Sequence, residues 1–132
     1  MSAFVDTSAF LALVVAEDLN HDAAANAWRE LLERDETLVT SNYVIVETLA
    51  LLQRRASIPT INRFVEDILP AVGIEWVDDR LHASGVNSLL MTTKSGPSIV
   101  DCVSFAVMRK LRIAEAFTFD RHFEAQGFNL VH

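Results

Sequence analysis

The sequence predicts an α/β fold in which helices cover both faces of a mainly parallel sheet. Short apolar segments that suit buried strands alternate along the whole chain with longer segments whose apolar residues recur every three to four positions. Such alternation is typical of parallel strands joined by helical crossovers. A chain of 132 residues also has the usual size of one domain. We therefore expect residues 1–132 to form a single domain with a substantial core.

Five segments have the length and apolar content of strands. The first is a short apolar run that suits a strand buried inside the sheet, and the next four are similarly short. Asp6 directly follows the first of these strands, and Asp120 directly follows the fourth. The predicted strands are Ala3–Val5, Thr37–Thr40, Ile74–Val77, Ala116–Phe119 and Asn129–Val131.

The segments between these strands are predicted to be helical, and several begin at residues suited to a first turn. Thr7 or Ser8 provides a hydroxyl N-cap for the first helix, Ser41 caps the third, and Pro59 suits the first turn of the fourth. A polar loop is expected at 92–97. The predicted helices span 9–16, 21–34, 41–55, 59–70, 78–90, 98–110 and 120–127.

The composition argues against several classes of protein. A net charge of -7 is unfavourable for binding nucleic acid non-specifically through a basic surface. The single cysteine, Cys102, cannot form an internal disulfide and has no Cys or His neighbour at zinc-site spacing, so a reducing cytoplasm fits best. The sequence starts without a basic leader and has no apolar run long enough to span a bilayer. We therefore expect neither export nor membrane association.

Four carboxylates stand where a shared site could form. Asp6 and Asp120 follow predicted strands, and ligand sites in parallel sheets form beyond the C-terminal ends of strands. Glu47 and Asp101 lie among apolar residues, where a carboxylate is costly unless it meets hydrogen bonds, basic partners or a metal. The three aspartates also have structural alternatives: two could be N-caps, and Asp101 could close a capping box with Ser98.

Taken together, the four acids predict a site for one or two hard cations such as Mg²⁺ or Mn²⁺, which prefer carboxylate oxygens. Sites of this kind support phosphodiester hydrolysis. If RNA is the substrate, the bound cations and a local set of basic residues must offset the negative charge of the chain. The basic set comprises Arg54, Arg55, Arg109, Lys110, Arg112 and Arg121.

The segments that carry these acids resemble the acidic motifs of PIN-domain nucleases, in matching order and spacing. The resemblance spans nearly the whole chain, and its closest variant is the VapC-type toxin of bacterial and archaeal toxin-antitoxin pairs. It implies a PIN-like three-layer α/β/α sandwich and a Mg²⁺- or Mn²⁺-dependent endoribonuclease. The segments are Phe4-Val5-Asp6-Thr7-Ser8, Val46-Glu47, Ile99-Val100-Asp101-Cys102 and Thr118-Phe119-Asp120-Arg121-His122-Phe123.

The resemblance also implies residue roles and partners. Thr7 and Thr118 would be supporting hydroxyls that orient ligands or water. The family features include a homodimer and a cognate antitoxin whose tail enters the active-site groove. We expect the helices at 41–55 and 59–69 to contribute to the homodimer. The implied catalytic and metal-binding residues are Asp6, Glu47, Asp101 and Asp120; the arginines considered for RNA contact are Arg54, Arg55 and Arg121.

Two other functions remain open. A phosphatase-type enzyme could use Asp6 as its nucleophile after the first strand, although Ser8 stands where such enzymes carry a second Asp. A PIN-like module could instead bind a protein partner without catalysis, but the retention of all four acids disfavours it. Metal titration separates the non-catalytic module from the nuclease, because such a module has no reason to gain stability from Mn²⁺ at concentrations where an intact carboxylate cluster would.

The remaining conspicuous residues are given structural interpretations. His122, on a short surface helix, is not counted among the catalytic residues, and Glu124 is expected to be exposed to solvent. Cys102, Trp28 and Trp76 are interpreted, with the phenylalanines, as core or interface residues.

Overall fold

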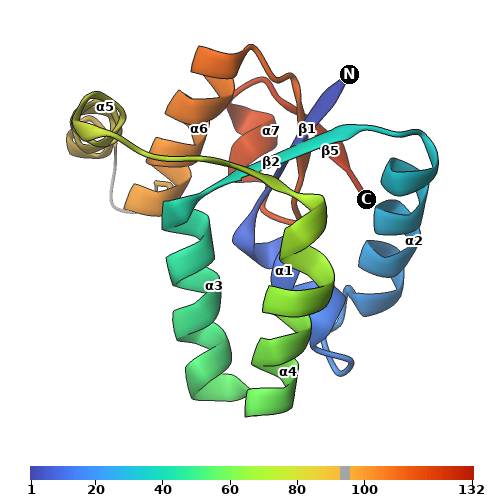
Figure 1. Ribbon diagram of the computed structural model, residues 1–132. Coiled ribbons are helices and arrows are strands. Elements are labelled where there is room, and N and C mark those ends of the chain that lie inside the picture. The colour runs from blue at the N-terminus through green and yellow to red at the C-terminus, as the bar shows by residue number, and fades with distance from the viewer. Residues whose placement is uncertain (93–95) are drawn as a thin grey trace.

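The computed structural model describes residues 1–92 and 96–132, so the predicted loop at 92–97 lies partly outside the described residues. Across these two ranges the strands form one sheet in the order β3-β2-β1-β4-β5 (Figure 1). Every neighbouring pair is parallel, which confirms the predicted α/β class with a mainly parallel sheet. The strands are β1 (Ser2–Val5), β2 (Thr37–Ser41), β3 (Gly73–Glu75), β4 (Glu115–Phe117) and β5 (Asn129–Val131).

Helices form a layer on each face of the sheet. The chain moves from β1 through β2 to β3 in one direction and then crosses to β4 and β5 in the other, so right-handed crossovers place α1–α4 on one face and α5–α7 on the opposite face. In Figure 1, α3 and α4 lie below the strands while α6 and α7 lie above. The helices are α1 (Thr7–Val14), α2 (His21–Glu33), α3 (Asn42–Arg55), α4 (Ile58–Arg63), α5 (Asp79–Leu90), α6 (Ile99–Leu111) and α7 (His122–Ala125).

Two helix starts differ from the prediction. Asp6, not Thr7 or Ser8, is the N-cap residue of α1, and its extended backbone (φ -96°, ψ 165°) continues the strand direction. Its side chain makes no capping bond, because the carboxylate is engaged elsewhere. The last short helix begins at His122 rather than at Asp120, since the residues between β4 and α7 form a turn.

The predicted helix at 59–70 is divided into three parts. α4 is followed by a π-helical segment, η1 (Phe64–Ile68), and by a 3₁₀ turn, η2 (Leu69–Ala71). In the wider π turn Phe64 stays fully buried and packs edge-on against Phe10, with ring centroids 5.0 Å apart. The helical pattern of the sequence therefore predicted where this helical segment lies, but it did not predict the change from α-helix to π-helix and 3₁₀ turn.

The centre of the sheet places two strand ends side by side. The apolar residues of β1 are completely buried, as expected for a strand covered on both faces. The Asp6 N–H donates to the Phe117 carbonyl at 3.1 Å and so continues the pairing of β1 with β4. Because the chain leaves β1 and β4 towards opposite edges, the crevice beyond their C-terminal ends is the expected ligand site of such a fold.

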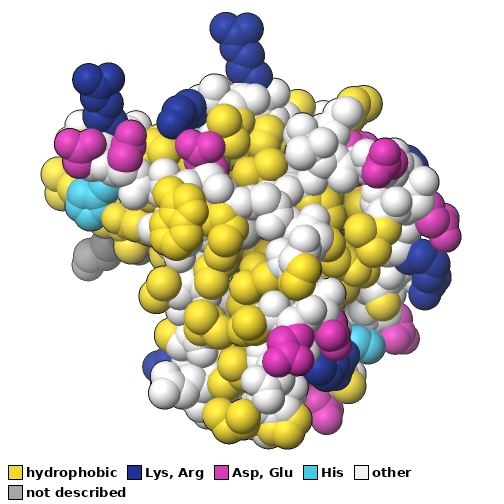
Figure 2. Space-filling view, in the orientation of Figure 1, with side chains coloured by type: hydrophobic (Ala, Val, Ile, Leu, Met, Phe, Trp, Pro, Cys, Tyr) yellow, Lys and Arg dark blue, Asp and Glu magenta, His cyan; other side chains and the backbone are white. Residues whose placement is uncertain are grey.

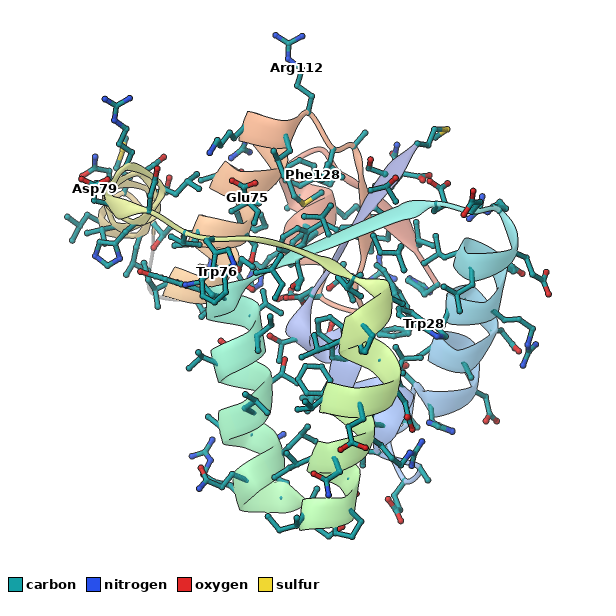
Figure 3. All side chains as sticks on the ribbon, viewed as in Figure 1. Trp28, Glu75, Trp76, Asp79, Arg112 and Phe128 are labelled. Atoms are coloured by element: carbon teal, nitrogen blue, oxygen red, sulfur yellow. The ribbon has the colours of Figure 1, made fainter. Side chains whose placement is uncertain are left out.

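Trp76 and Cys102, which were both interpreted as core or interface residues, differ in their exposure to solvent. Trp76, which is labelled in Figure 3, is 68% exposed, so its interpretation as a core residue is wrong and only an interface role remains open. Cys102, in contrast, is buried. No helix within the described ranges has both the length and the apolar character that crossing a bilayer requires.

Candidate metal centre

The four predicted acids line one pocket of about 300 Å³ beyond the C-terminal ends of β1 and β4. They reach it from four places: Asp6 follows β1, Glu47 lies in the second turn of α3, Asp101 lies in the first turn of α6, and Asp120 follows β4. The expected convergence on one groove is therefore observed. No Lys or Arg of the described residues lines this pocket.

Hydroxyl groups hold the ends of β1 and β4 together behind this pocket. Oδ2 of Asp6 accepts hydrogen bonds from Thr118 Oγ1 at 2.9 Å and from Ser8 Oγ at 3.1 Å. Thr118 Oγ1 in turn accepts from the Asp120 N–H at 3.0 Å, and Ser8 Oγ accepts from the Phe119 N–H at 2.9 Å. The two aspartates that follow the strands are thus fixed relative to each other.

Ser8 is a site residue that the sequence analysis missed. From the sequence, Ser8 is expected only as an N-cap and as the residue in place of a phosphatase aspartate. Its signal was a short hydroxyl side chain two positions after a strand-ending aspartate, a spacing at which local hydrogen bonds to a carboxylate are common. Thr118, which is predicted as a supporting hydroxyl, is completely buried and donates to Asp6 Oδ2.

Asp101 combines a structural and a site position. Its Oδ2 accepts from the Ser98 N–H and its N–H donates to Ser98 Oγ, both at 3.1 Å, so the capping box of the structural alternative is present. The same carboxylate lines the acidic pocket. Capping therefore fixes Asp101 at the start of α6 without removing it from the site.

Burial and mutual repulsion perturb the acids of the pocket. Burial raises the pKa of Asp6 from 3.8 to about 6, against the opposing effect of the Thr118 hydrogen bond. Burial and the nearby charge of Asp6 raise the pKa of Asp101 to about 6. The pKa of Glu47 is also raised, mainly by burial. Carboxylates crowded in this way favour either protonation or a bound cation.

The Thr7 hydroxyl is an unsatisfied polar group in the same pocket. It lies close enough to Glu47 to lower the pKa of that carboxyl group. The geometry nevertheless falls short of a hydrogen bond, so Thr7 Oγ1 has no hydrogen-bond partner among the described residues. The oxygen is buried, so bulk water cannot satisfy it. This pocket therefore presents a free hydroxyl in addition to its carboxylates.

None of the arginines considered for RNA contact is among the described residues that line the acidic pocket. Arg54 and Arg55 lie at the far end of α3, about 10 Å along the helix from Glu47. Arg55 lines a different pocket, formed with α1 and α4. Arg121 is exposed and pairs with Glu124 at 3.1 Å, so Glu124 has the solvent-exposed position expected of it.

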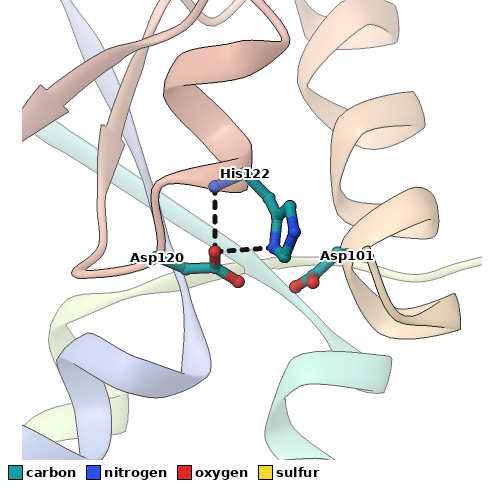
Figure 4. Close-up of side chains that lie close together, drawn as sticks. All are labelled: Asp101, Asp120 and His122. Carbon is teal, nitrogen blue, oxygen red and sulfur yellow. Dashed lines mark hydrogen bonds and ion pairs between the residues drawn. The ribbon is translucent and has the colours of Figure 1, made fainter. Parts of the chain in front are cut away.

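His122 lies beside the acids although the sequence analysis left it out. Figure 4 shows its ring next to the carboxylates of Asp120 and Asp101. Nδ1 of His122 is 2.9 Å from Asp120 Oδ1, and the His122 N–H donates to the same oxygen at 2.9 Å. Its sequence position, two residues after a strand-ending aspartate, was the available signal.

Comparison with known proteins decides the family. The PIN domain matches residues 3–129, which is most of the chain. The chain belongs to the PIN-domain family. This PIN-domain chain is also similar to the 23S rRNA-specific endonuclease VapC20 of Mycobacterium tuberculosis, in each of two strains. The identity is 36% over 126 residues, which cover 95% of this chain and 94% of the relative.

Solved structures agree with this assignment. The crystal structure of M. tuberculosis VapC20, described as a sarcin-ricin loop cleaving toxin, matches the PIN-domain chain with a TM-score of 0.84 and 35% identity, covering 96% of each chain. The Pyrobaculum aerophilum protein PAE2754 matches with a TM-score of 0.58 and 18% identity over 98% of this chain and 89% of its own, which shows the fold alone. The predicted PIN-like fold and VapC-like ribonuclease class are therefore confirmed.

Proposed function

We propose that this PIN-domain chain hydrolyses RNA phosphodiester bonds with one or two divalent cations held by Asp6, Glu47, Asp101 and Asp120. The observation that carries the proposal is the convergence of these four carboxylates, from four separate parts of the chain, on one pocket without a lysine or arginine among its described lining residues. Such a pocket lacks a permanent positive charge to offset its acids. A divalent cation would supply it.

The residues of the pocket fit Mg²⁺ or Mn²⁺. The donors are carboxylate oxygens, which both ions prefer, and the buried Thr7 hydroxyl is a further oxygen without a partner among the described residues. When bound, such an ion supplies Lewis-acid activation of the phosphate and of the attacking water. The chain itself supplies orientation: Ser8 and Thr118 hold Asp6, and the Ser98 cap holds Asp101.

We infer that large-subunit ribosomal RNA is the first substrate to test, because VapC20 is 23S rRNA-specific and described as cleaving the sarcin-ricin loop. Purified protein would be incubated with 23S rRNA and with a hairpin carrying that loop, in Mg²⁺, in Mn²⁺ and in EDTA. Sequencing the RNA ends would map the cleavage position. Cleavage is expected with either ion and not in EDTA or with the Asp120→Asn variant. Cleavage that persists in EDTA would contradict the proposed metal dependence.

The structure makes the two alternative functions less favourable. Oδ2 of Asp6 already accepts two hydroxyl hydrogen bonds and the residue is only 3% exposed, which is a poor arrangement for a phosphatase nucleophile. A binding module without catalysis would have no need for four carboxylates that line one pocket. Failure of Mn²⁺ to raise the melting temperature would favour that module.

We propose further that the chain forms a homodimer and pairs with a cognate protein antitoxin in the cytoplasm. Apolar side chains extend across the face shown in Figure 2. A largely apolar hollow of about 390 Å³ beside Glu47 is lined by α3 and the start of α6, and Val46 on its rim is 65% exposed. Exposed apolar surface of this extent is typical of protein interfaces. The other strongly exposed apolar residues include Ile58, Trp76, Leu90 and Met91.

Light scattering and coexpression test these partners separately. A dimer mass at micromolar concentration is expected, and a monodisperse monomer at high concentration would contradict the homodimer. Coexpression with the product of a neighbouring small reading frame is expected to relieve growth inhibition by the chain. Absence of any such neighbouring frame would count against the antitoxin but not against the nuclease.

A further inference from the structure

We propose that His122 is a direct metal ligand, through Nδ1, in addition to the acids. The inference rests on the proposed function, since it concerns the same metal centre, but it changes the composition of that centre. An imidazole nitrogen would join carboxylate oxygens that were the only ligands expected from the sequence. The proposal is argued from the positions of Asp101, Asp120 and His122, which Figure 4 shows together.

The three side chains present ligand atoms at coordination spacing. One oxygen of Asp101, one oxygen of Asp120 and one ring nitrogen of His122 all lie within 4.8 Å of one another. Nδ1 of His122 is 2.9 Å from Oδ1 of Asp120. Two adjacent ligands of an octahedral ion, each about 2.1 Å from it, are separated by about 3 Å. The observed separation is therefore the one expected for two ligands of a single ion.

A hydrogen bond between His122 and Asp120 does not explain this contact. Nδ1 is buried and lies 2.9 Å from Asp120 Oδ1. Despite this short distance, it has no partner with hydrogen-bond geometry among the described residues. Oδ1 of Asp120 already accepts the His122 backbone N–H at 2.9 Å. The side chain as a whole is 43% exposed, so its solvent contact lies on other atoms of the ring. In the tautomer that carries its proton on Nε2, a buried Nδ1 in this position is well placed to bind a cation.

The rival interpretation makes His122 a positioning residue that only orients Asp120. Histidines and carboxylates beside metal ligands often act in this way. The two interpretations differ in one measurable property, because only direct ligation joins a ring nitrogen to the metal. They also differ in the effect of His122→Asn, whose amide N–H can still reach Asp120 but whose side chain has no imidazole.

Pulsed electron paramagnetic resonance of the Mn²⁺-loaded protein tests nitrogen ligation directly. We expect ¹⁴N modulation from a coordinated imidazole in the wild type, and its loss in both His122→Ala and His122→Asn. His82→Ala is the matched control, because His82 is exposed on α5 and contacts Tyr43 outside the acidic pocket. Its spectrum should equal that of the wild type. Absence of ¹⁴N modulation in the Mn²⁺-loaded wild type overturns the proposal.

Calorimetric titration with Mn²⁺ provides the second readout. We expect both His122 variants to bind Mn²⁺ at least about tenfold more weakly than the wild type, since even residues that only contact ligands contribute about 10- to 100-fold. The His82→Ala control should stay within about twofold. Full affinity in His122→Asn would identify a positioning role and overturn direct ligation, with the four-carboxylate proposal intact. If the wild type binds no Mn²⁺, the proposed function itself fails.

Discussion

Neutralising Asp6 should stabilise the metal-free protein. Asp6 is almost completely buried, and its pKa is raised from 3.8 to about 6 chiefly by that burial. The ionised carboxylate is therefore less favourable in the folded chain than in the unfolded chain. Asp6→Asn keeps an oxygen that can accept from Thr118 and Ser8 while removing the charge. The variant should fold normally and lose metal-dependent cleavage.

The magnitude follows from the two pKa values. One pKa unit corresponds to about 1.4 kcal/mol, so the change from 3.8 to about 6 costs the folded wild type about 3 kcal/mol at pH 8. Because the folded pKa is the higher one, the stability that protonated Asp6 contributes is fully present below pH 3.8. It is lost as the pH rises through about 6. Asp6→Asn should therefore gain up to about 3 kcal/mol at pH 8, and less than about 1 kcal/mol at pH 4.

Thermal melts in EDTA at pH 4 and pH 8 measure this difference. A gain of 3 kcal/mol corresponds to a rise in melting temperature on the order of 10 °C for a chain of this size. Asp67→Asn, at an exposed acid in η1, is the control and should change little at either pH. Mn²⁺ should stabilise the wild type and hardly affect Asp6→Asn. A variant that is equally destabilised at both pH values would refute the argument and give Asp6 a purely structural role.

Three further predictions concern other parts of the chain. Asp101→Asn should abolish cleavage, and in EDTA at pH 4, below its raised folded pKa of about 6, it should change stability by less than about 1 kcal/mol. Ser98→Ala should lose about 1 kcal/mol of capping energy in melts and retain cleavage in the folded fraction. Gly85→Ala should cost about 1–3 kcal/mol by denaturant unfolding, because its Cβ would lie 2.3 Å from Val103 Cγ2; an unchanged midpoint would contradict the close packing of α5 on α6. Trp76→Lys should shift the proposed dimer towards monomer in light scattering, and an unchanged mass would exclude Trp76 from the interface.

Much of the fold could be predicted because the hydrophobic pattern and the burial agree. All five strands were located within two residues, since each is short and apolar between helical segments. The boundaries were less accurate where tertiary hydrogen bonds decide them. Asp6 is the N-cap residue of α1 by its backbone, while its carboxylate bonds to Thr118 just after β4, which lies far away in the sequence. The π turn at Phe64 likewise occurs where that ring packs against Phe10.

The candidate site was predicted as a set of residue types rather than as a geometry. Strand ends and unexpected acids in apolar helices identified the four carboxylates that now share a pocket. Ser8 and His122 were missed because their positions depend on how the turn after β4 folds back, which short-range patterns do not specify. Arg55 is a candidate because of its charge and its place on the helix that carries Glu47, but the length of α3 places it in another pocket.

The two hydroxyl bonds to Asp6 limit how that carboxylate can coordinate. With Oδ2 occupied by Ser8 and Thr118, the group has only Oδ1 left for an ion and can act as a monodentate ligand. Ca²⁺ accepts bidentate carboxylates and six to eight oxygens in a flexible geometry, whereas Mg²⁺ requires single oxygens at the corners of an octahedron. Two neutral hydroxyl groups thus leave Asp6 only one oxygen for coordination. This gives the proposed centre a means of discriminating between smaller and larger cations.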